Sequence, residues 1–246
     1  MIRIKYSIIL KMKKQNNILQ EGSVNNMQVR KTLVLSMQTL KKEVIDMAEL
    51  TLDNIKKAFH AFQEADQVAA RDTLKLDDAV DTAEESIAKH ALQVIWREQP
   101  VASDLRLVTG ILKMITDIER IGDHACDVAY MTTNINAKPN SHVLSLATKL
   151  MNNLVAMYKM TIEALELNNE ALAQKVIEED EQINQVYKEA LSKITDMIKK
   201  DQIEAEEAVY SLMILKYLEK IGDHATNIAE WIIFTLTGIH KKTELY

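Results

Sequence analysis

Acidic residues spaced four positions apart occur twice in the chain, in two closely similar stretches. Residues 119–129 are ERIGDHACDVA and residues 219–229 are EKIGDHATNIA, so one sequence unit is used twice. In a helix, Glu119, Asp123 and Asp127 would lie on one face. Like charges at this spacing repel each other, whereas a hard cation bound by oxygen ligands would relieve the repulsion. The pattern therefore predicts a metal site on each stretch, with a solvated acidic face as the alternative.

Further acids in the preceding segment of each repeat match one another at a fixed offset. Asp77 and Asp81 correspond in this way to Asp180 and Asn184. One helix offers too few oxygens for a shell of roughly six ligands, so we expect the preceding helix to contribute, through Asp77 and Asp180 first. A plain charged surface remains an alternative for this preceding segment. The predicted metal ligands are Glu119, Asp123, Asp127, Asp77 and Asp81 in the first repeat, and Glu219, Asp223, Asn227, Asp180 and Asn184 in the second.

Along each predicted motif helix, apolar residues recur in steps of three and four, on the side of the helix opposite the acids. A di-iron site of the ferritin type needs carboxylates that point into the core, together with Glu-x-x-His spacing. Neither feature is present, so we expect exposed metal sites, no catalytic residue and no enzymatic activity. The two stripes are Ile111, Met114, Ile118, Ile121, Ala125 and Val128, and Leu215, Leu218, Ile221, Ala225, Ile228 and Ile232.

His124, His224 and Cys126 also lie within the motifs. The histidines project between the acidic face and the apolar face. A role as metal ligand or ligand support, or a structural hydrogen bond between helices, is open for both. Cys126 is the single cysteine and has no thiol partner, so we interpret it as inert.

The composition limits the class of protein. The 246 residues include five glycines and two prolines, which favours long helices. One cysteine excludes an intramolecular disulfide and suits a reducing cytoplasm. A net charge of −6 argues against nucleic-acid binding, and no apolar run approaches the roughly 18 residues of a membrane span.

The repeat and the helical periodicity predict an all-α fold of six long antiparallel helices, arranged as two tandem three-helix bundles. We place the first bundle at residues 29–137 and the second at 138–238, with a C-terminal tail at 239–246. Residues 1–28 are basic and are expected to be a poorly ordered extension, so the first helix should start near Val29. Helices are also expected at about 66–98 and 103–134. The repeat offset falls from 103 to 100 between them, and we assign the three extra residues to the turn at 98–103.

The two E-[RK]-I-G-D-H-A motifs, together with the segment QPVASDLR at residues 99–106, resemble the PhoU family of phosphate-signalling regulators. The resemblance implies a cytoplasmic homodimer that touches the membrane only through its partners. Those partners would be the ATPase subunit of the phosphate ABC transporter and a sensor histidine kinase. Its role would be to repress phosphate uptake and the phosphate-starvation response when phosphate is ample.

The same resemblance implies that the E-x-x-x-D motifs bind metal, iron in the first place and otherwise zinc, nickel, manganese or magnesium. The family often has Asn at the position of Asp127, so the first site would be more anionic than usual. Two other classes remain: a metal-dependent helical-bundle enzyme and a purely structural helical adaptor. Retention of metal by the purified protein separates the adaptor from the other two.

Overall fold

The structure is a computed structural model that describes the backbone of residues 2–240 and 243–244 and the side chains of residues 30–240. Within these limits the chain forms seven helices and one short hairpin, so the predicted all-α class is confirmed. The elements are α1 Ile2–Glu64, α2 Gln67–Leu74, α3 Asp77–Glu98, α4 Ser103–Thr132, α5 Ser141–Leu167, α6 Glu170–Lys199, α7 Ala205–Thr237, β1 Ile239–His240 and β2 Thr243–Glu244.

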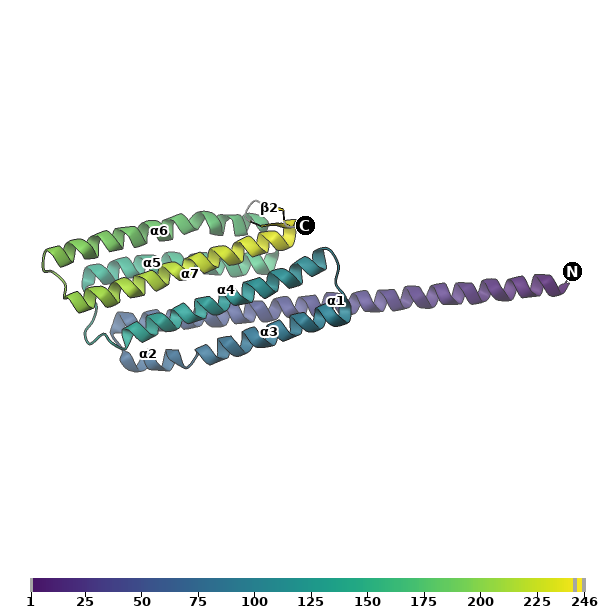
Figure 1. Cartoon of the computed structure of the whole chain (residues 1–246), viewed down its shortest axis with the longest axis horizontal. Coiled ribbons are helices and arrows are strands. Elements are labelled where there is room, and N and C mark those ends of the chain that lie inside the picture. The colour runs from purple at the N-terminus through teal and green to yellow at the C-terminus, as the bar shows by residue number, and fades with distance from the viewer. Residues whose placement is uncertain (1, 241–242, 245–246) are drawn as a thin grey trace.

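The helices form two three-helix bundles that lie side by side (Figure 1). In the first bundle, α2 and α3 together take the place of one helix between α1 and α4. The second bundle consists of α5, α6 and α7. Helices α4 and α7, which carry the two motifs, pack along each other in opposite directions, and α1 packs against α5. The two motifs therefore meet at the junction of the bundles, which the sequence had not indicated.

The apolar stripes of the motif helices form part of one continuous core. All twelve residues predicted for the two stripes are buried. Burying a side chain such as Ile or Leu contributes roughly 1.5–3 kcal/mol, so these stripes decide how each helix is rotated in its bundle. As predicted, the acids of each motif lie on the other side of the helix.

The second helix of each repeat begins with an equivalent cap. The Asp66 side chain accepts hydrogen bonds from the backbone N–H groups of Val68 at 2.9 Å and Ala69 at 3.0 Å. The Asn169 side chain accepts one from the N–H of Leu172 at 3.0 Å. Each cap satisfies backbone donors that the first helical turn leaves unpaired. The duplication is therefore also visible in the start signals of these helices.

The predicted helix at about 66–98 is broken, which corrects the sequence interpretation. Helix α2 ends at Leu74 and α3 begins at Asp77, with a tight turn between them. In that turn the N–H of Lys75 bonds the carbonyl of Asp72 at 3.3 Å, and the N–H of Leu76 bonds that of Thr73 at 3.0 Å. No glycine or proline marks the break, so no punctuation signal existed in the sequence. Helix α6, its counterpart, is continuous.

The three extra residues of the first repeat do not lie in the turn at 98–103. The connection between α3 and α4 is no longer than the one between α6 and α7. Instead, α3 continues beyond the position equivalent to the end of α6, and α4 begins before the position equivalent to the start of α7. Pro100 in the sequence indicates that a helix ends before it, but it does not indicate the lengths of α3 and α4.

Helix α1 begins at Ile2, not near Val29 as the apolar pattern predicted. Residues 2–26 include one glycine and no proline, so no strong breaker interrupts the helix there. The amphipathic pattern marks only the part of α1 that packs on the bundle, and Figure 1 shows the remainder projecting beyond it. The side chains of residues 2–29 lie outside the described residues, so the expected poor order of the extension stays a prediction. In the C-terminal tail, β1 pairs with β2 as an antiparallel hairpin.

No helix in the described part of the chain is both long enough and apolar enough to cross a membrane.

Candidate metal centres

The first acidic set consists of Asp77 and Asp81 on α3 and Glu119 and Asp123 on α4. Burial raises the pKa of Glu119, and the nearby negative charges of Asp123 and Asp81 raise it further against the opposing effect of Arg120. Burial likewise raises the pKa of Asp77, followed by the charges of Asp81 and Asp123. The structure therefore brings together the acids predicted from two different helices. Asp127 lies one turn further along α4.

The second acidic set consists of Asp180 and Asn184 on α6 and Glu219 and Asp223 on α7. The Asn184 amide donates a hydrogen bond to Asp180 Oδ2 at 2.8 Å. Burial raises the pKa of Asp180, and the charges of Asp223 and Glu219 add to the effect. Asn227, also predicted here, instead donates to Asp117 Oδ1 of α4 at 3.1 Å.

Glycines at equivalent positions allow the helices that carry each set to approach closely. A Cβ on Gly122 would lie 3.1 Å from Val80 Cγ1, and a Cβ on Gly222 would lie 3.3 Å from Ile183 Cγ2. Such separations are tighter than most packed contacts, so a side chain at either position would force its neighbour to move by a few tenths of an ångström. The two glycines thus position α3 against α4 and α6 against α7, next to the acids.

The expectation that the acids are exposed is wrong for Glu219, which is only 8% exposed. Burial, followed by the charge of Glu219, raises the pKa of Tyr187 on the neighbouring helix α6, and the ammonium of Lys216 lies 5.3 Å from the centre of that ring. A helical wheel places residues relative to one helix and does not include the neighbour that covers the polar face. The other acids of the two sets range from half-buried to exposed, and Asp81 is exposed.

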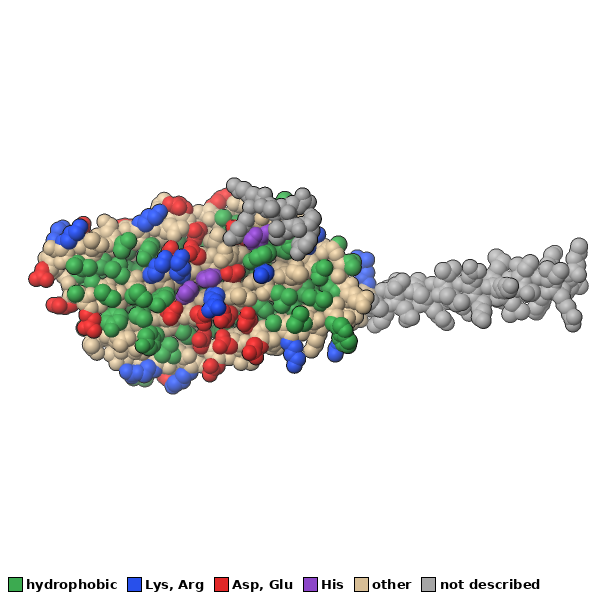
Figure 2. Space-filling model, in the orientation of Figure 1, with side chains coloured by type: hydrophobic (Ala, Val, Ile, Leu, Met, Phe, Trp, Pro, Cys, Tyr) green, Lys and Arg blue, Asp and Glu red, His purple; other side chains and the backbone are tan. Residues whose placement is uncertain are grey.

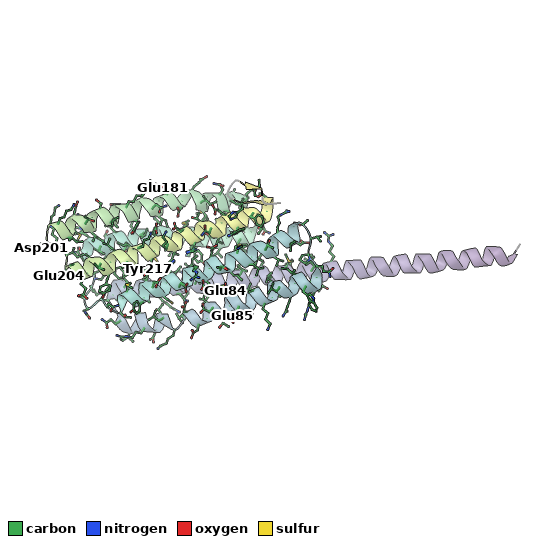
Figure 3. All side chains as sticks on the ribbon, in the orientation of Figure 1. Glu84, Glu85, Glu181, Asp201, Glu204 and Tyr217 are labelled. Atoms are coloured by element: carbon green, nitrogen blue, oxygen red, sulfur yellow. The ribbon has the colours of Figure 1, made fainter. Side chains whose placement is uncertain are left out.

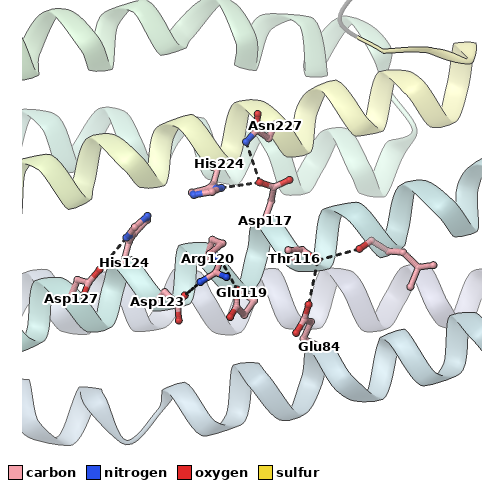
Figure 4. Close-up of polar contacts among 11 residues, drawn as sticks. Glu84, Thr116, Asp117, Glu119, Arg120, Asp123, His124, Asp127, His224 and Asn227 are labelled. Atoms are coloured by element: carbon pink, nitrogen blue, oxygen red, sulfur yellow. Dashed lines mark hydrogen bonds and ion pairs between the residues drawn. The ribbon is translucent and has the colours of Figure 1, made fainter. Parts of the chain in front are cut away.

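Each set is also paired with a basic residue of its own motif. Arg120 Nη1 lies 2.7 Å from Asp123 Oδ2 (Figure 4). Lys220 makes the equivalent ion pair with Asp223. Lys216 Nζ lies 2.8 Å from Glu219 Oε2. We had not predicted this neutralisation. The occurrence of a basic residue at both 120 and 220, three positions before the aspartate, was the signal for it.

The carboxylates of the two acidic sets are chemically suited to a hard cation, but their side chains are not arranged around a single point. Among the described residues, no three His, Cys, Asp or Glu side chains are placed to hold one ion together. However, Oδ1 of Asp77 and Oδ1 of Asp180 are buried without a hydrogen-bond partner, at equivalent positions in the two repeats. Buried carboxylate oxygens rarely lack partners, and carboxylates are the ligands that hard cations take. A cation bound through Asp123 or Asp223 would compete with the ion pairs that these aspartates make with Arg120 and Lys220.

Cys126 lies beside the first acidic set. Burial, followed by the negative charge of Asp77, raises the pKa of the Cys126 thiol to about 12. The thiol is therefore protonated at neutral pH, which agrees with the interpretation of Cys126 as inert, because the thiolate is the reactive form.

Both motif histidines lie at the junction of α4 and α7, where Figure 4 shows them with their carboxylate partners. His224 Nδ1 lies 2.8 Å from Asp117 Oδ1 on α4. His124 Nδ1 lies 3.2 Å from Asp127 Oδ2 on its own helix, and its ring stacks with Tyr217 at a centroid distance of 5.7 Å. Asp117 was missed because the equivalent position in the second repeat is Tyr217, so comparing the repeats did not select it.

Figure 3 shows Glu84 on α3 and Tyr217 on α7, on either side of α4. Glu84 accepts a hydrogen bond from the hydroxyl of Thr116 at 3.3 Å, which ties α3 to α4 beside the first acidic set. Burial raises the pKa of Tyr217, as does the charge of Asp127. This tyrosine of the second repeat therefore lies near an acid of the first. The polar residues of the two motifs form one band across the α3–α4–α7 face.

Comparison with known proteins supports this organisation. The PhoU domain model matches residues 44–132 and 147–232. The chain is 28% identical over 210 residues to the phosphate-specific transport system accessory protein PhoU homolog of Clostridium acetobutylicum, covering 85% of this chain and 96% of that protein.

Two solved structures share the fold. The crystal structure of PhoU from Pseudomonas aeruginosa matches with a TM-score of 0.78 at 28% identity, covering 83% of this chain and 99% of that one. The phosphate transport system regulatory protein PhoU from Streptococcus pneumoniae matches with a TM-score of 0.79 at 24% identity, covering 84% and 98%. The two matched domains correspond to the two bundles, and each contains one acidic motif. The chain belongs to the PhoU family and carries two PhoU domains in tandem.

Proposed function

We propose that the protein is a non-enzymatic accessory regulator of a phosphate-specific transport system. In this role it lowers phosphate uptake and represses the phosphate-starvation response when phosphate is plentiful. It would couple the ATPase subunit of the phosphate ABC transporter to a sensor histidine kinase as a cytoplasmic homodimer. The observation that carries the proposal is the match of both PhoU domains, in order, over nearly the whole length of a relative named as an accessory protein of this system.

The experiment is deletion of the gene in its host, with alkaline phosphatase as the reporter. We expect the enzyme to be produced in phosphate-rich medium after deletion, and a plasmid copy of the gene to restore repression. An empty plasmid is the control. Unchanged repression after deletion would contradict the proposed function. Co-purification with the kinase and the ATPase subunit, together with light scattering of the pure protein, tests the partners and the dimer.

We also propose that each acidic set binds a hard cation, iron first and otherwise zinc, nickel, manganese or magnesium. Two features support this. The buried Oδ1 atoms of Asp77 and Asp180 make no hydrogen bond of ordinary geometry, although Cys126 and Thr226 lie near these carboxyls, and burial raises the pKa of both. A bound cation would satisfy these oxygens and favour the ionised form of each acid. Arg120 and Lys220 would then serve as the counter-charges of the metal-free state.

Elemental analysis of the purified protein tests the metal proposal. Replacing Glu219→Gln and Asp223→Asn together should remove metal from the second acidic set and leave the helical content unchanged. Glu178→Gln is a matched control, because Glu178 is an exposed acid on α6. If the double variant retains the metal content of the wild type, the second acidic set is not a metal site.

A further inference from the structure

The histidines of the two motifs face each other across the junction of the bundles. The ring centroids of His124 on α4 and His224 on α7 lie 5.5 Å apart, with the ring planes inclined by 37°. Their side chains are 20% and 22% exposed, so both rings reach solvent. Figure 2 shows histidine side chains reaching the surface in the middle of this face, above a band of acidic side chains.

One nitrogen of each ring is already held by a carboxylate. Nδ1 of His224 pairs with Asp117 at 2.8 Å, and Nδ1 of His124 pairs with Asp127 at 3.2 Å. A histidine that binds metal through Nε2 is typically held in this way, because a carboxylate on Nδ1–H selects the tautomer and makes Nε2 more basic. Within the described side chains, neither Nε2 atom has a protein hydrogen-bond partner. Figure 4 shows the remaining nitrogen of each ring on the side toward the other ring.

The spacing of the rings suits a single ion between them. Two imidazole nitrogens bind one tetrahedral zinc ion at about 2.0–2.1 Å, which places the ring centres about 5 Å apart. The observed separation of 5.5 Å requires only a small adjustment of the side chains. Imidazole is a ligand for zinc, nickel and copper, whereas the carboxylates of the acidic sets suit harder cations.

We propose that His124 and His224 form a third metal site, which binds a divalent transition ion such as Zn²⁺ between the two PhoU domains. The two Nε2 atoms are the protein ligands, and water completes the coordination. Asp117 and Asp127 act as positioning residues that orient the rings. Because the two ligands come from different bundles, the ion links α4 to α7, whereas each acidic set lies within one bundle.

Calorimetric titration of the metal-free full-length protein with ZnCl₂ tests this site. We expect His124→Gln and His224→Gln each to weaken this binding event by roughly tenfold or more, since each removes half of the protein ligands. Asp117→Asn should weaken binding by about 10–100-fold, as is typical when the support of a ligating histidine is removed. His90→Gln is the matched control: His90 Nδ1 also pairs with a carboxylate, Glu43, at 2.7 Å, but no second imidazole ring is in contact with it among the described residues.

The double variant Glu219→Gln/Asp223→Asn distinguishes this site from the acidic sets. It should still bind Zn²⁺ at the two histidines with the affinity of the wild type. The proposal is overturned if His124→Gln and His224→Gln bind Zn²⁺ as the wild type does, or if His90→Gln weakens binding equally. If His224→Gln fails to fold because Asp117 loses its partner, His124→Gln decides the test. Its carboxylate partner, Asp127, is 40% exposed and can be solvated by water.

Discussion

The hydroxyl groups of Thr51 on α1 and Tyr158 on α5 lie 2.8 Å apart in the buried contact between the two bundles. Both residues are 0% exposed. The Thr51 hydroxyl also lies 2.9 Å from the carbonyl of Ala48, to which it donates. The Tyr158 hydroxyl is therefore the donor to Thr51, and this is its one hydrogen bond among the described residues. Burial raises the pKa of Tyr158, as expected for a phenol with no access to water.

This direction of the bond predicts unequal effects of two conservative substitutions. Tyr158→Phe removes the donor, while Thr51 keeps its bond to Ala48, so the loss should be about 1 kcal/mol. Thr51→Val leaves the Tyr158 hydroxyl buried without a partner, which costs roughly 1–3 kcal/mol. Urea unfolding measures both free energies. The double variant should lose less than the sum of the two single losses, and strict additivity would show that the two hydroxyls do not interact.

Gly110 of α4 packs tightly against Thr235 of α7. A Cβ at this position would lie closer to Thr235 Cγ2 than real Cβ atoms come to any neighbour. Gly110→Ala should therefore destabilise the fold by about 1–3 kcal/mol through overpacking. With Thr235→Ala already present, the same change should stabilise by up to about 1 kcal/mol, because alanine favours the helix over glycine. Thermal unfolding of the four proteins gives the result, and a loss that persists without the threonine methyl would contradict the packing explanation.

The raised pKa of Asp180 predicts a pH-dependent effect of its removal. Because burial and the charges of Asp223 and Glu219 raise this pKa above its usual 3.8, ionisation costs the folded state free energy. The stability contribution of the protonated acid is complete below the usual value and is lost as the pH rises through the raised value. In chelator at pH 7, Asp180→Asn should therefore be more stable than the wild type, by at most about 1 kcal/mol because solvent screens the site.

The advantage of Asp180→Asn should shrink when unfolding is measured below about pH 3, well under the usual 3.8, where the unfolded and folded carboxyls are both largely protonated. Glu178→Gln, at an exposed position on the same helix, should show no such pH dependence. A gain for Asp180→Asn that is equal at both pH values would point to a packing effect in place of the carboxylate charge.

The ion pairs of the motif lysine predict opposite effects on folding and on metal binding. Lys220 neutralises Glu219 and Asp223 when no metal is present. Lys220→Met should lower the stability of the metal-free protein by up to about 1 kcal/mol. It should tighten metal binding to the second acidic set by roughly tenfold, because a competing positive charge is gone. Titration with Mn²⁺ measures the affinity, and Lys149→Met, which breaks the 3.0 Å pair with Glu189 elsewhere, is the control. Weaker binding in Lys220→Met would mean that the lysine helps to build the site.

Periodicity and duplication predicted most of the architecture, because they record features within one helix. The stripe from Ile111 to Val128 determined the rotation of α4, and the equivalent caps Asp66 and Asn169 determined where two helices begin. The break at Lys75–Leu76 was not predictable, since its i→i+3 hydrogen bonds need no special residue. A structural feature that requires no particular residue type leaves no recognisable pattern in the sequence.

The candidate sites were predictable only as far as each helix defines them. Asp77 and Asp180 were predicted because they occupy equivalent positions in the two repeats. Glu219 is buried near Tyr187 of a neighbouring helix, and the role of Asp117 depends on the antiparallel packing of α4 on α7. The first relationship joins two helices of the second repeat and the second joins the two repeats, so neither exists within one helix. Contacts between helices are therefore the part that required the structure.

The most direct test of the account measures repression and metal content in the same protein. In the deletion strain grown in phosphate-rich medium, alkaline phosphatase is assayed with plasmids carrying the wild type or the quadruple variant Glu119→Gln/Asp123→Asn/Glu219→Gln/Asp223→Asn. We predict that the quadruple variant, folded and present at normal levels, loses both the metal of the acidic sets and the repression. Full repression by a variant that elemental analysis shows to have lost this metal would contradict the claim that the acidic sets regulate the phosphate response.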